Sequence, residues 1–156
     1  MLVTISSTLD AAPAVVRQLV QRSDTLIYIS HPLIRFVPIQ PSALPDVWSP
    51  GDYLVSIRSL GVLPLGTQVI RIEHPPTADP DTFLLRDNGS GQLVRVWDHL
   101  ITIRPDANDG KTQYADRVEV SAGVLTPFIW LFAQGFYRWR QYRWKKLLSS
   151  DGTQLP

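Results

Sequence analysis

The chain has 156 residues, which is the length of one ordinary domain. Its hydrophobic fraction of 44% and its charged fraction of 19% exclude a disordered or collagen-like protein. The absence of cysteine excludes a disulfide scaffold, a thiolate metal site and a cysteine nucleophile.

The net charge of +1 conceals a basic segment, residues 138–146. This segment holds five of the 15 basic residues and no acidic one, so the rest of the chain has 10 basic and 14 acidic residues. A nucleic-acid-binding domain would be basic overall, so we expect no nucleic acid as a partner. No basic n-region of a signal peptide is visible at the start, and we expect a cytoplasmic protein.

The first 50 residues predict one strand, two helices and a loop. Residues 2–8 are apolar and β-branched enough for a strand. A helix should follow with Pro13 in its first turn, and a second, short helix should begin near Asp24. Five prolines between residues 31 and 50 indicate a loop around at most one strand near 33–37, which a proline keeps at a sheet edge.

The middle of the chain has the texture of consecutive strands. Segments rich in valine, isoleucine, leucine, threonine and aromatic residues alternate with short turns rich in glycine, proline, aspartate and asparagine. No helix fits into these gaps, so neighbouring strands should pair antiparallel as a meander. The predicted strands are residues 53–60, 67–74, 82–86, 93–104 and 111–120, with a turn at 87–91.

The last predicted element is a long helix. Thr126 and Pro127 form a typical helix start, and the helical pattern continues to about Leu148. The fold class is therefore α+β, with one antiparallel sheet of six or seven strands whose only sufficiently long cover is this helix. We expect a single domain over residues 1–150 and a C-terminal tail over 151–156.

Several local patterns accompany this order of elements. They are Trp48-x-x-Gly51, the glycine-bounded hairpin 61–66, Trp97-x-His99, Tyr114-x-Asp116-Arg117 and the aromatic, arginine-rich final helix. Together they resemble the START-like helix-grip fold, also called the SRPBCC superfamily, which includes polyketide cyclases, allergens and lipid-transfer domains. The resemblance implies a curved sheet wrapped around the last helix, with a cavity between them that usually holds an apolar ligand.

The chain shows no strong catalytic or cofactor motif. Phosphate-binding loops, dinucleotide fingerprints, zinc-protease motifs and nucleophile elbows are all absent from the sequence. The three histidines, His31, His74 and His99, do not have metal-ligand spacing. We therefore expect no metal and no cofactor.

The best candidate constellation lies on the last two predicted strands. Trp97 and His99 share one face of the first strand, and Tyr114 and Asp116 share one face of the second. If the turn between the strands is symmetric, His99 lies directly opposite Asp116, within reach of a hydrogen bond. A carboxylate so close should raise the pKa of the histidine, and the pair should be an isolated polar spot on an apolar face.

Three interpretations of this pair stay open. It is a structural hydrogen bond, a polar anchor for a bound ligand, or an acid–base pair. A slip of the register by one residue would place His99 against Arg117 instead and remove the pair.

The final helix has two apolar faces. One sector should face the sheet, and Phe132 and Phe136 near its middle are the expected cavity-lining residues. The stripe of Trp130, Tyr137 and Trp144 should then lie on the outer side. That stripe needs cover, from stacked arginines, from a second copy in a homodimer or from a lipid surface.

The uncharged residues 120–137 imitate a membrane span, but the helix begins only near residue 127, which leaves too few apolar helical residues to cross a membrane.

The function that we expect is binding of a small hydrophobic or aromatic ligand between the last helix and the sheet. The alternatives are a polyketide cyclase/dehydratase-like enzyme that uses His99 and Asp116, and an interaction module that uses the outer helix face. The expected ligand-binding residues are Trp97, His99, Tyr114, Asp116, Phe132 and Phe136.

Overall fold

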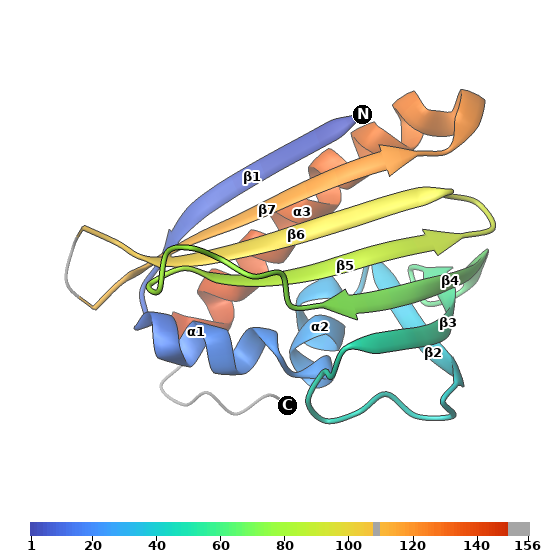
Figure 1. Ribbon diagram of the computed structural model, residues 1–156. Coiled ribbons are helices and arrows are strands. Elements are labelled where there is room, and N and C mark those ends of the chain that lie inside the picture. Colours follow the sequence, from blue (N-terminus) through green and yellow to red (C-terminus); the bar gives the residue numbers. More distant parts are fainter. Residues whose placement is uncertain (108–109, 150–156) are drawn as a thin grey trace.

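The computed structural model describes residues 1–107 and 110–149. Seven strands form a single antiparallel sheet, and the helices lie on one side of it (Figure 1). The strands are β1 (Leu2–Leu9), β2 (Ile34–Gln40), β3 (Gly51–Ser59), β4 (Leu63–Glu73), β5 (Phe83–Gly91), β6 (Val96–Pro105) and β7 (Thr112–Ser121).

The strand order is β1-β7-β6-β5-β4-β3-β2. Strands β2 to β7 therefore form the predicted meander, and β1 joins its far side next to β7. The strand near residues 33–37 is at an edge, as predicted, although it extends to Gln40. The turn predicted at 87–91 is wrong, because β5 continues through these residues to Gly91.

Strand β7 shows why one face of the sheet is buried. Tyr114, Asp116 and Val118 are buried, whereas Gln113, Arg117 and Glu119 between them are exposed. Because successive side chains on a strand point to opposite faces, the apolar set is directed at the helices and the charged set at solvent. Asp116 is the exception, a carboxylate on the buried face.

The helices form the second layer. These are α1 (Pro13–Val20), α2 (Ser23–Ser30), the single turn η1 (Gly123–Leu125) and α3 (Thr126–Ser149). Helix α3 has 24 residues and runs diagonally behind the sheet, in contact with β1, β7 and α2 (Figure 1). It begins as predicted at Thr126, and the predicted tail, residues 151–156, lies outside the described residues.

The predicted rotation of α3 about its axis is wrong. Tyr137 and Trp144, assigned to an outer stripe with Trp130, are completely buried against the sheet. The indole of Trp130 donates a 2.8 Å hydrogen bond to the Leu2 carbonyl oxygen. Tyr137 and Trp144 are therefore covered by the chain's own sheet, and only Trp130 of this stripe is partly exposed. The expected homodimer through this face stays a prediction. The buried side is centred on Ala133, about a quarter turn from the predicted sector.

The predicted register of β6 and β7 is wrong by two residues. His99 lies opposite Val118, and Asp116 lies opposite Ile101. The ladder extends to Pro105 opposite Thr112, so the connecting loop lies one residue further along the chain than expected. A shift of two residues keeps every side chain on its predicted face, so His99 and Asp116 still meet, but diagonally.

Candidate functional site

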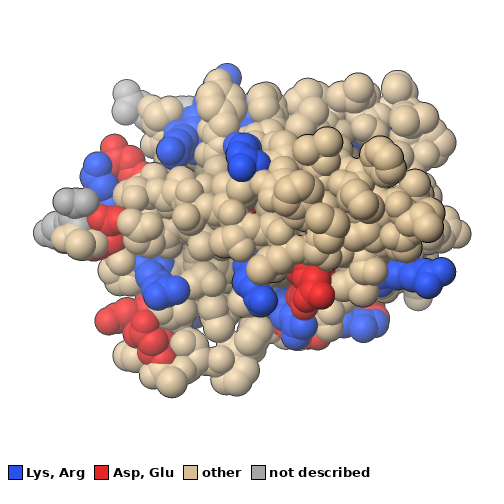
Figure 2. Space-filling view, turned by 90° about the horizontal axis from the view of Figure 1, so that it is seen from above, with Lys and Arg blue, Asp and Glu red and all other residues tan. Residues whose placement is uncertain are grey.

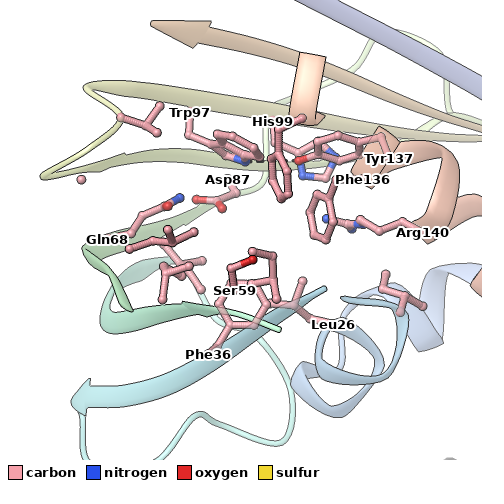
Figure 3. A pocket seen from close by; sticks show the side chains of 18 of the residues that line it. Leu26, Phe36, Ser59, Gln68, Asp87, Trp97, His99, Phe136, Tyr137 and Arg140 are labelled. Carbon is pink, nitrogen blue, oxygen red and sulfur yellow. Dashed lines mark hydrogen bonds between the residues drawn. The ribbon is translucent and has the colours of Figure 1, made fainter. Parts of the chain in front are cut away.

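A cavity of about 320 Å³ lies between α3, α2 and the inner face of strands β2–β6 (Figure 3). Its wall is mainly aliphatic and aromatic, with few polar groups, which is the usual composition of a small-molecule site. The apolar side chains come from every element around it, for example Ile29 from α2, Ile57 from β3, Ile70 from β4 and Leu85 from β5.

Helix α3 contributes a graded series of side chains to this wall. Phe128, Phe132 and Phe136 recur at intervals of four, so they lie one above the other along the helix. Their exposed fractions fall from 72% through 38% to 4%, and Arg140, one turn further, is also 4% exposed. The series therefore marks a path from solvent at the start of α3 to a closed interior end about 18 Å away at 1.5 Å per residue.

The mouth of the cavity is bordered by exposed apolar residues. Leu63 at the β3–β4 hairpin and Leu93 in the β5–β6 turn line the cavity and are exposed. No charged residue occurs in the flanking segments 59–70 and 120–137. In Figure 2, accordingly, uncharged side chains dominate the part of the surface over the start of α3. The entrance is therefore mainly apolar, and the β5–β6 turn adds one exposed charge, Arg95.

The structure places four of the six predicted site residues on the cavity wall. These are Trp97, His99, Phe132 and Phe136. Tyr114 and Asp116 are fully buried and do not line the cavity. They lie in the layer behind His99, so the prediction that they contact a ligand directly needs correction.

His99 and Asp116 form the predicted hydrogen bond, with 2.7 Å between Nε2 and Oδ1. The expected direction of the histidine shift is wrong, because burial lowers the pKa of His99 more than Asp116 raises it. Burial alone would raise the pKa of Asp116, but His99, Arg140 and Gln141 together lower it. The pair is thus a neutral imidazole that donates its Nε2 proton to an ionised carboxylate.

Asp116 is held by two further donors. The hydroxyl of Tyr114 donates to Oδ1 over 3.2 Å, and the amide of Gln141 donates to Oδ2 over 3.1 Å. These bonds satisfy the carboxylate and fix the orientation of the imidazole in front of it. The pair is therefore not an isolated polar spot, as expected from the sequence, but part of a buried network.

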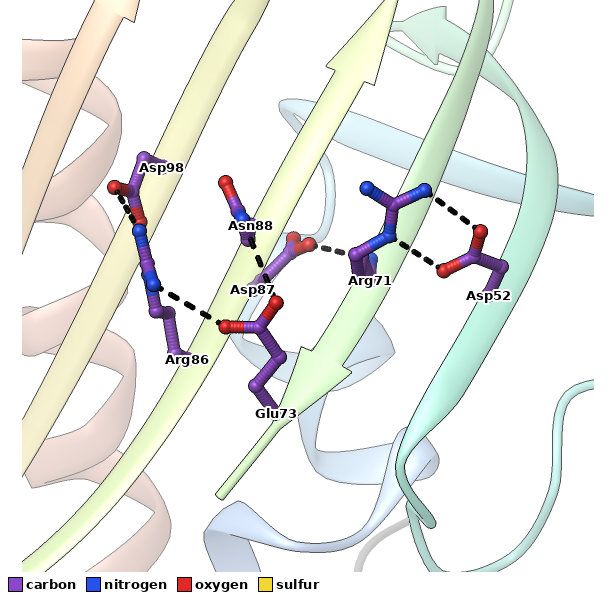
Figure 4. A network of polar contacts seen from close by, with 7 residues as sticks. All are labelled: Asp52, Arg71, Glu73, Arg86, Asp87, Asn88 and Asp98. Carbon is purple, nitrogen blue, oxygen red and sulfur yellow. Dashed lines mark hydrogen bonds and ion pairs between the residues drawn. The ribbon is translucent and has the colours of Figure 1, made fainter. Parts of the chain in front are cut away.

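Asp87 is a site residue that the sequence analysis missed. It lies on β5 opposite His99 and lines the cavity. Its carboxylate accepts a 2.8 Å hydrogen bond from the backbone N–H of Arg71 on β4 (Figure 4). Burial raises the pKa of Asp87 to about 7, although the hydrogen bond from Arg71 lowers it in part. Near neutral pH the cavity therefore holds a carboxyl group that can both give and take a proton.

Two glycines beside Asp87 explain why a turn was predicted there. A Cβ atom on Gly89 would lie 2.7 Å from the Val69 carbonyl oxygen, and one on Gly91 would lie 2.7 Å from that of Thr67. Both positions need glycine because the β4 backbone comes so close. The sequence Asp-Asn-Gly-Ser-Gly has the composition of a turn, but here the glycines serve strand packing.

Arg140 is the second missed residue, and it brings a buried positive charge to the cavity wall. Its Cζ lies 5.0 Å from the ring centre of Tyr137 and 5.8 Å from that of Phe136. Burial opposes its charged form, but Tyr137, Asp116 and Tyr114 more than offset this and raise its pKa. The sequence placed this arginine in a basic helix end, where nothing distinguished it from its exposed neighbours.

Tyr137 completes the polar part of the wall. Its hydroxyl accepts a 3.2 Å hydrogen bond from the indole of Trp97, and its ring packs against His99. Burial raises the pKa of this phenol well above its usual value, so it stays protonated and can donate.

The outer face of the sheet carries a different kind of polar network. The Arg86 guanidinium holds Asp98 through two hydrogen bonds of 2.8 and 2.7 Å and reaches Glu73 at 3.2 Å (Figure 4). These side chains are partly exposed, and together they pair off charges of opposite sign. Ion pairs of this kind contribute little to stability.

Within residues 1–107 and 110–149 no group of three or more histidine, aspartate and glutamate side chains is arranged to hold a metal ion. In the same part of the chain no helix is long and apolar enough to span a membrane.

No model of a known protein family matches the sequence, and no curated protein matches it. Solved structures do. A START superfamily protein from Mycobacterium smegmatis superposes with a TM-score of 0.65 at 13% identity, over 94% of this chain and 96% of its own. A conserved protein from Geobacillus kaustophilus gives 0.61 at 16% identity, over 96% and 95%. A hypothetical protein from Helicobacter pylori gives 0.67 at 9% identity, over 95% and 88%. With its seven-stranded sheet and long C-terminal helix, the chain has the START-like fold.

Proposed function

We propose that the protein binds a small, mainly apolar molecule in the cavity between α3, α2 and the sheet. The observation that carries this proposal is the cavity itself, about 320 Å³ in volume, with an apolar wall and an apolar entrance. Burial of apolar surface contributes about 25 cal/mol per Å², so after the costs of association we expect micromolar affinity.

A ligand screen tests this proposal directly. Small aromatic and aliphatic compounds are added to the protein, and the melting temperature and the tryptophan fluorescence are followed. Trp97 and Trp48 line the cavity, so a bound aromatic compound should change their emission. A ligand at 100 times its Kd should add about 2.7 kcal/mol to the free energy of unfolding. If no apolar compound changes either signal, the proposal fails.

A matched variant separates the cavity from nonspecific apolar surface. Ile70→Phe places a larger side chain in the cavity wall, whereas Val62→Phe enlarges a side chain that is 78% exposed at the hairpin tip. We expect the first variant to weaken binding at least tenfold and the second to leave it unchanged. Equal binding by both variants would place the ligand elsewhere.

A second candidate function is acid–base catalysis of the polyketide cyclase/dehydratase kind. The observation that favours it is the 2.7 Å bond between His99 Nε2 and Asp116, because it leaves Nδ1 of a neutral imidazole free to act as a base. The His99→Gln variant distinguishes the two functions. An enzyme would lose turnover and keep its ligand, whereas a binding protein would show only a modest change of affinity.

The substrate for that comparison is best found by mass spectrometry of molecules that copurify with the protein. The cytoplasmic location stays a prediction from the sequence.

A further inference from the structure

The buried end of the cavity contains a cation that forms no ion pair among the described residues. Arg140 is 96% buried, since its exposed fraction is 4%. Among the described residues no carboxylate oxygen lies within 4.0 Å of its guanidinium. Its Nε atom is buried without any hydrogen bond. A buried charge without a paired counter-ion is costly, so such a group needs an explanation.

Asp116 does not supply that explanation. It is the ionised carboxylate nearest in the network, but its oxygens are already bound by His99, Tyr114 and Gln141. Asp116 acts on Arg140 only through a longer-range attraction, as does Asp87 across the cavity wall. The neighbouring groups of the guanidinium are the Tyr114 hydroxyl and two aromatic rings. A guanidinium has five N–H donors, which is more than the number of hydrogen-bond acceptors that these neighbours offer.

The position of Arg140 relative to the cavity suggests what is missing. Arg140 lines the cavity next to Phe136 (Figure 3). It is the buried end of a series on α3 in which Phe132 and Phe128 are increasingly exposed toward the mouth. A molecule that entered would pass apolar residues first and meet the guanidinium last. The hydroxyl of Tyr137, whose ring lies 5.0 Å from Cζ of Arg140, offers a neutral donor beside the cation.

We propose that Arg140 binds the acidic group of the ligand, so that the ligand class is an apolar carboxylic acid with its carboxylate at the closed end and its apolar body toward the mouth. A planar guanidinium matches a carboxylate through two parallel hydrogen bonds, which fits this class. The inference rests on the proposed ligand-binding function and narrows its ligand.

The test compares an acid with a neutral molecule of the same shape. Naphthaleneacetic acid and naphthaleneacetamide form one pair, and decanoic acid and decanamide form a second. Binding of each is measured by calorimetry or tryptophan fluorescence at pH 7.5, where both acids are ionised. We expect each acid to bind the unmodified protein at least tenfold more tightly than its amide.

Two variants of α3 assign the preference to a residue. Arg140→Met removes the buried cation, and Arg138→Met removes a cation from the same helix that is exposed and bonded to Gln134. The first should bring acid and amide to within twofold of each other, and the second should keep the tenfold preference. Arg140→Lys, which keeps the charge, serves if Arg140→Met does not fold, and it should keep part of the preference.

The outcomes distinguish the two proposals. If acid and amide bind equally well to the unmodified protein, the role of Arg140 is overturned and the binding function stands. If the preference survives in Arg140→Met, another group binds the acid and the role of Arg140 is likewise overturned. If neither member of either pair binds, while other apolar compounds do, the acid class is wrong. If no apolar compound binds, the proposed function itself fails.

Discussion

The two halves of the space under the sheet differ in how they are filled. On the side of β1 and β7, α3 packs directly on the strands. The ring centres of Tyr114 and Trp144 lie 5.4 Å apart there, and both residues are fully buried. On the side of β2 to β5, α3 stands off and the cavity remains. One half provides stability, and the other is free to hold a ligand.

Two carboxylates, the buried Asp116 and the half-buried Asp87, express the same difference. Asp116, in the filled half, is surrounded by donors that hold it ionised. Asp87, at the cavity, has one backbone donor and is held partly protonated by burial. The carboxylate of Asp116 is therefore satisfied, whereas that of Asp87 keeps capacity for a further partner.

The largest effect is expected from shortening a core aromatic residue. Tyr114→Ala should cost about 3–5 kcal/mol, because it empties a site that is closed on all sides. Phe132→Ala, at the rim of the cavity, should cost less than about 1 kcal/mol. Urea unfolding of both variants measures the contrast. Equal losses would mean that the two halves are packed alike.

Asp87→Asn should raise stability in a pH-dependent way. The folded-state pKa of Asp87 is raised from 3.8 to about 7, so the folded protein binds the extra proton, and the unmodified protein loses stability as the pH rises from about 4 to 7. The uncharged variant does not, and above pH 7 it should be more stable by up to about 4 kcal/mol at 1.36 kcal/mol per pKa unit. A difference that stays constant between pH 4 and 8 would contradict this.

Asp116→Asn should lower the stability of the protein near neutral pH, whereas Asp87→Asn should raise it. The pKa of Asp116 is lowered, so the ionised carboxylate stabilises the fold above its unfolded value of 3.8, and that contribution is lost as the pH falls through the lower folded value. The variant should therefore lose roughly 3 kcal/mol at pH 7 and approach the unmodified protein in strong acid. Thermal unfolding over a pH series measures this, and a gain of stability at pH 7 would refute it.

A smaller effect is expected when the same enlargement is made in both halves. Ile103→Phe, in the filled half and away from the cavity, should cost about 1–3 kcal/mol through overpacking. Ile70→Phe, in the cavity wall, should cost less than about 1 kcal/mol because the added atoms find space. Calorimetric melting measures the loss of stability in both variants. A larger loss for Ile70→Phe than for Ile103→Phe would contradict the position of the cavity.

The sequence was sufficient for the order of elements and for the faces of the strands. Both depend on the alternation of apolar and polar residues, which survives a register error of two, as the contact between His99 and Asp116 shows. The rotation of α3 could not be found in this way. Its first half is apolar nearly all round, and Phe128 is exposed at the mouth rather than packed against the sheet.

The missed residues have a common cause. Asp87 lies in a glycine-rich stretch that local rules assign to a turn, and Arg140 lies in a run of basic residues that local rules assign to a solvated helix end. Their burial is decided by strands and helices distant in sequence, so no local pattern carries it. Only the folded chain shows that Asp87 lies next to Arg71 and that Arg140 lies next to Tyr114.

Gly89 and Gly91 give the sheet a fixed spacing at one place. Any side chain there would meet the carbonyl oxygens of β4 at 2.7 Å and force the two strands apart. The strand that would be displaced is the one whose amide holds Asp87. A single added methyl group would therefore both widen the chamber and release its carboxyl group, so the dimensions of the chamber and its proton chemistry cannot vary independently.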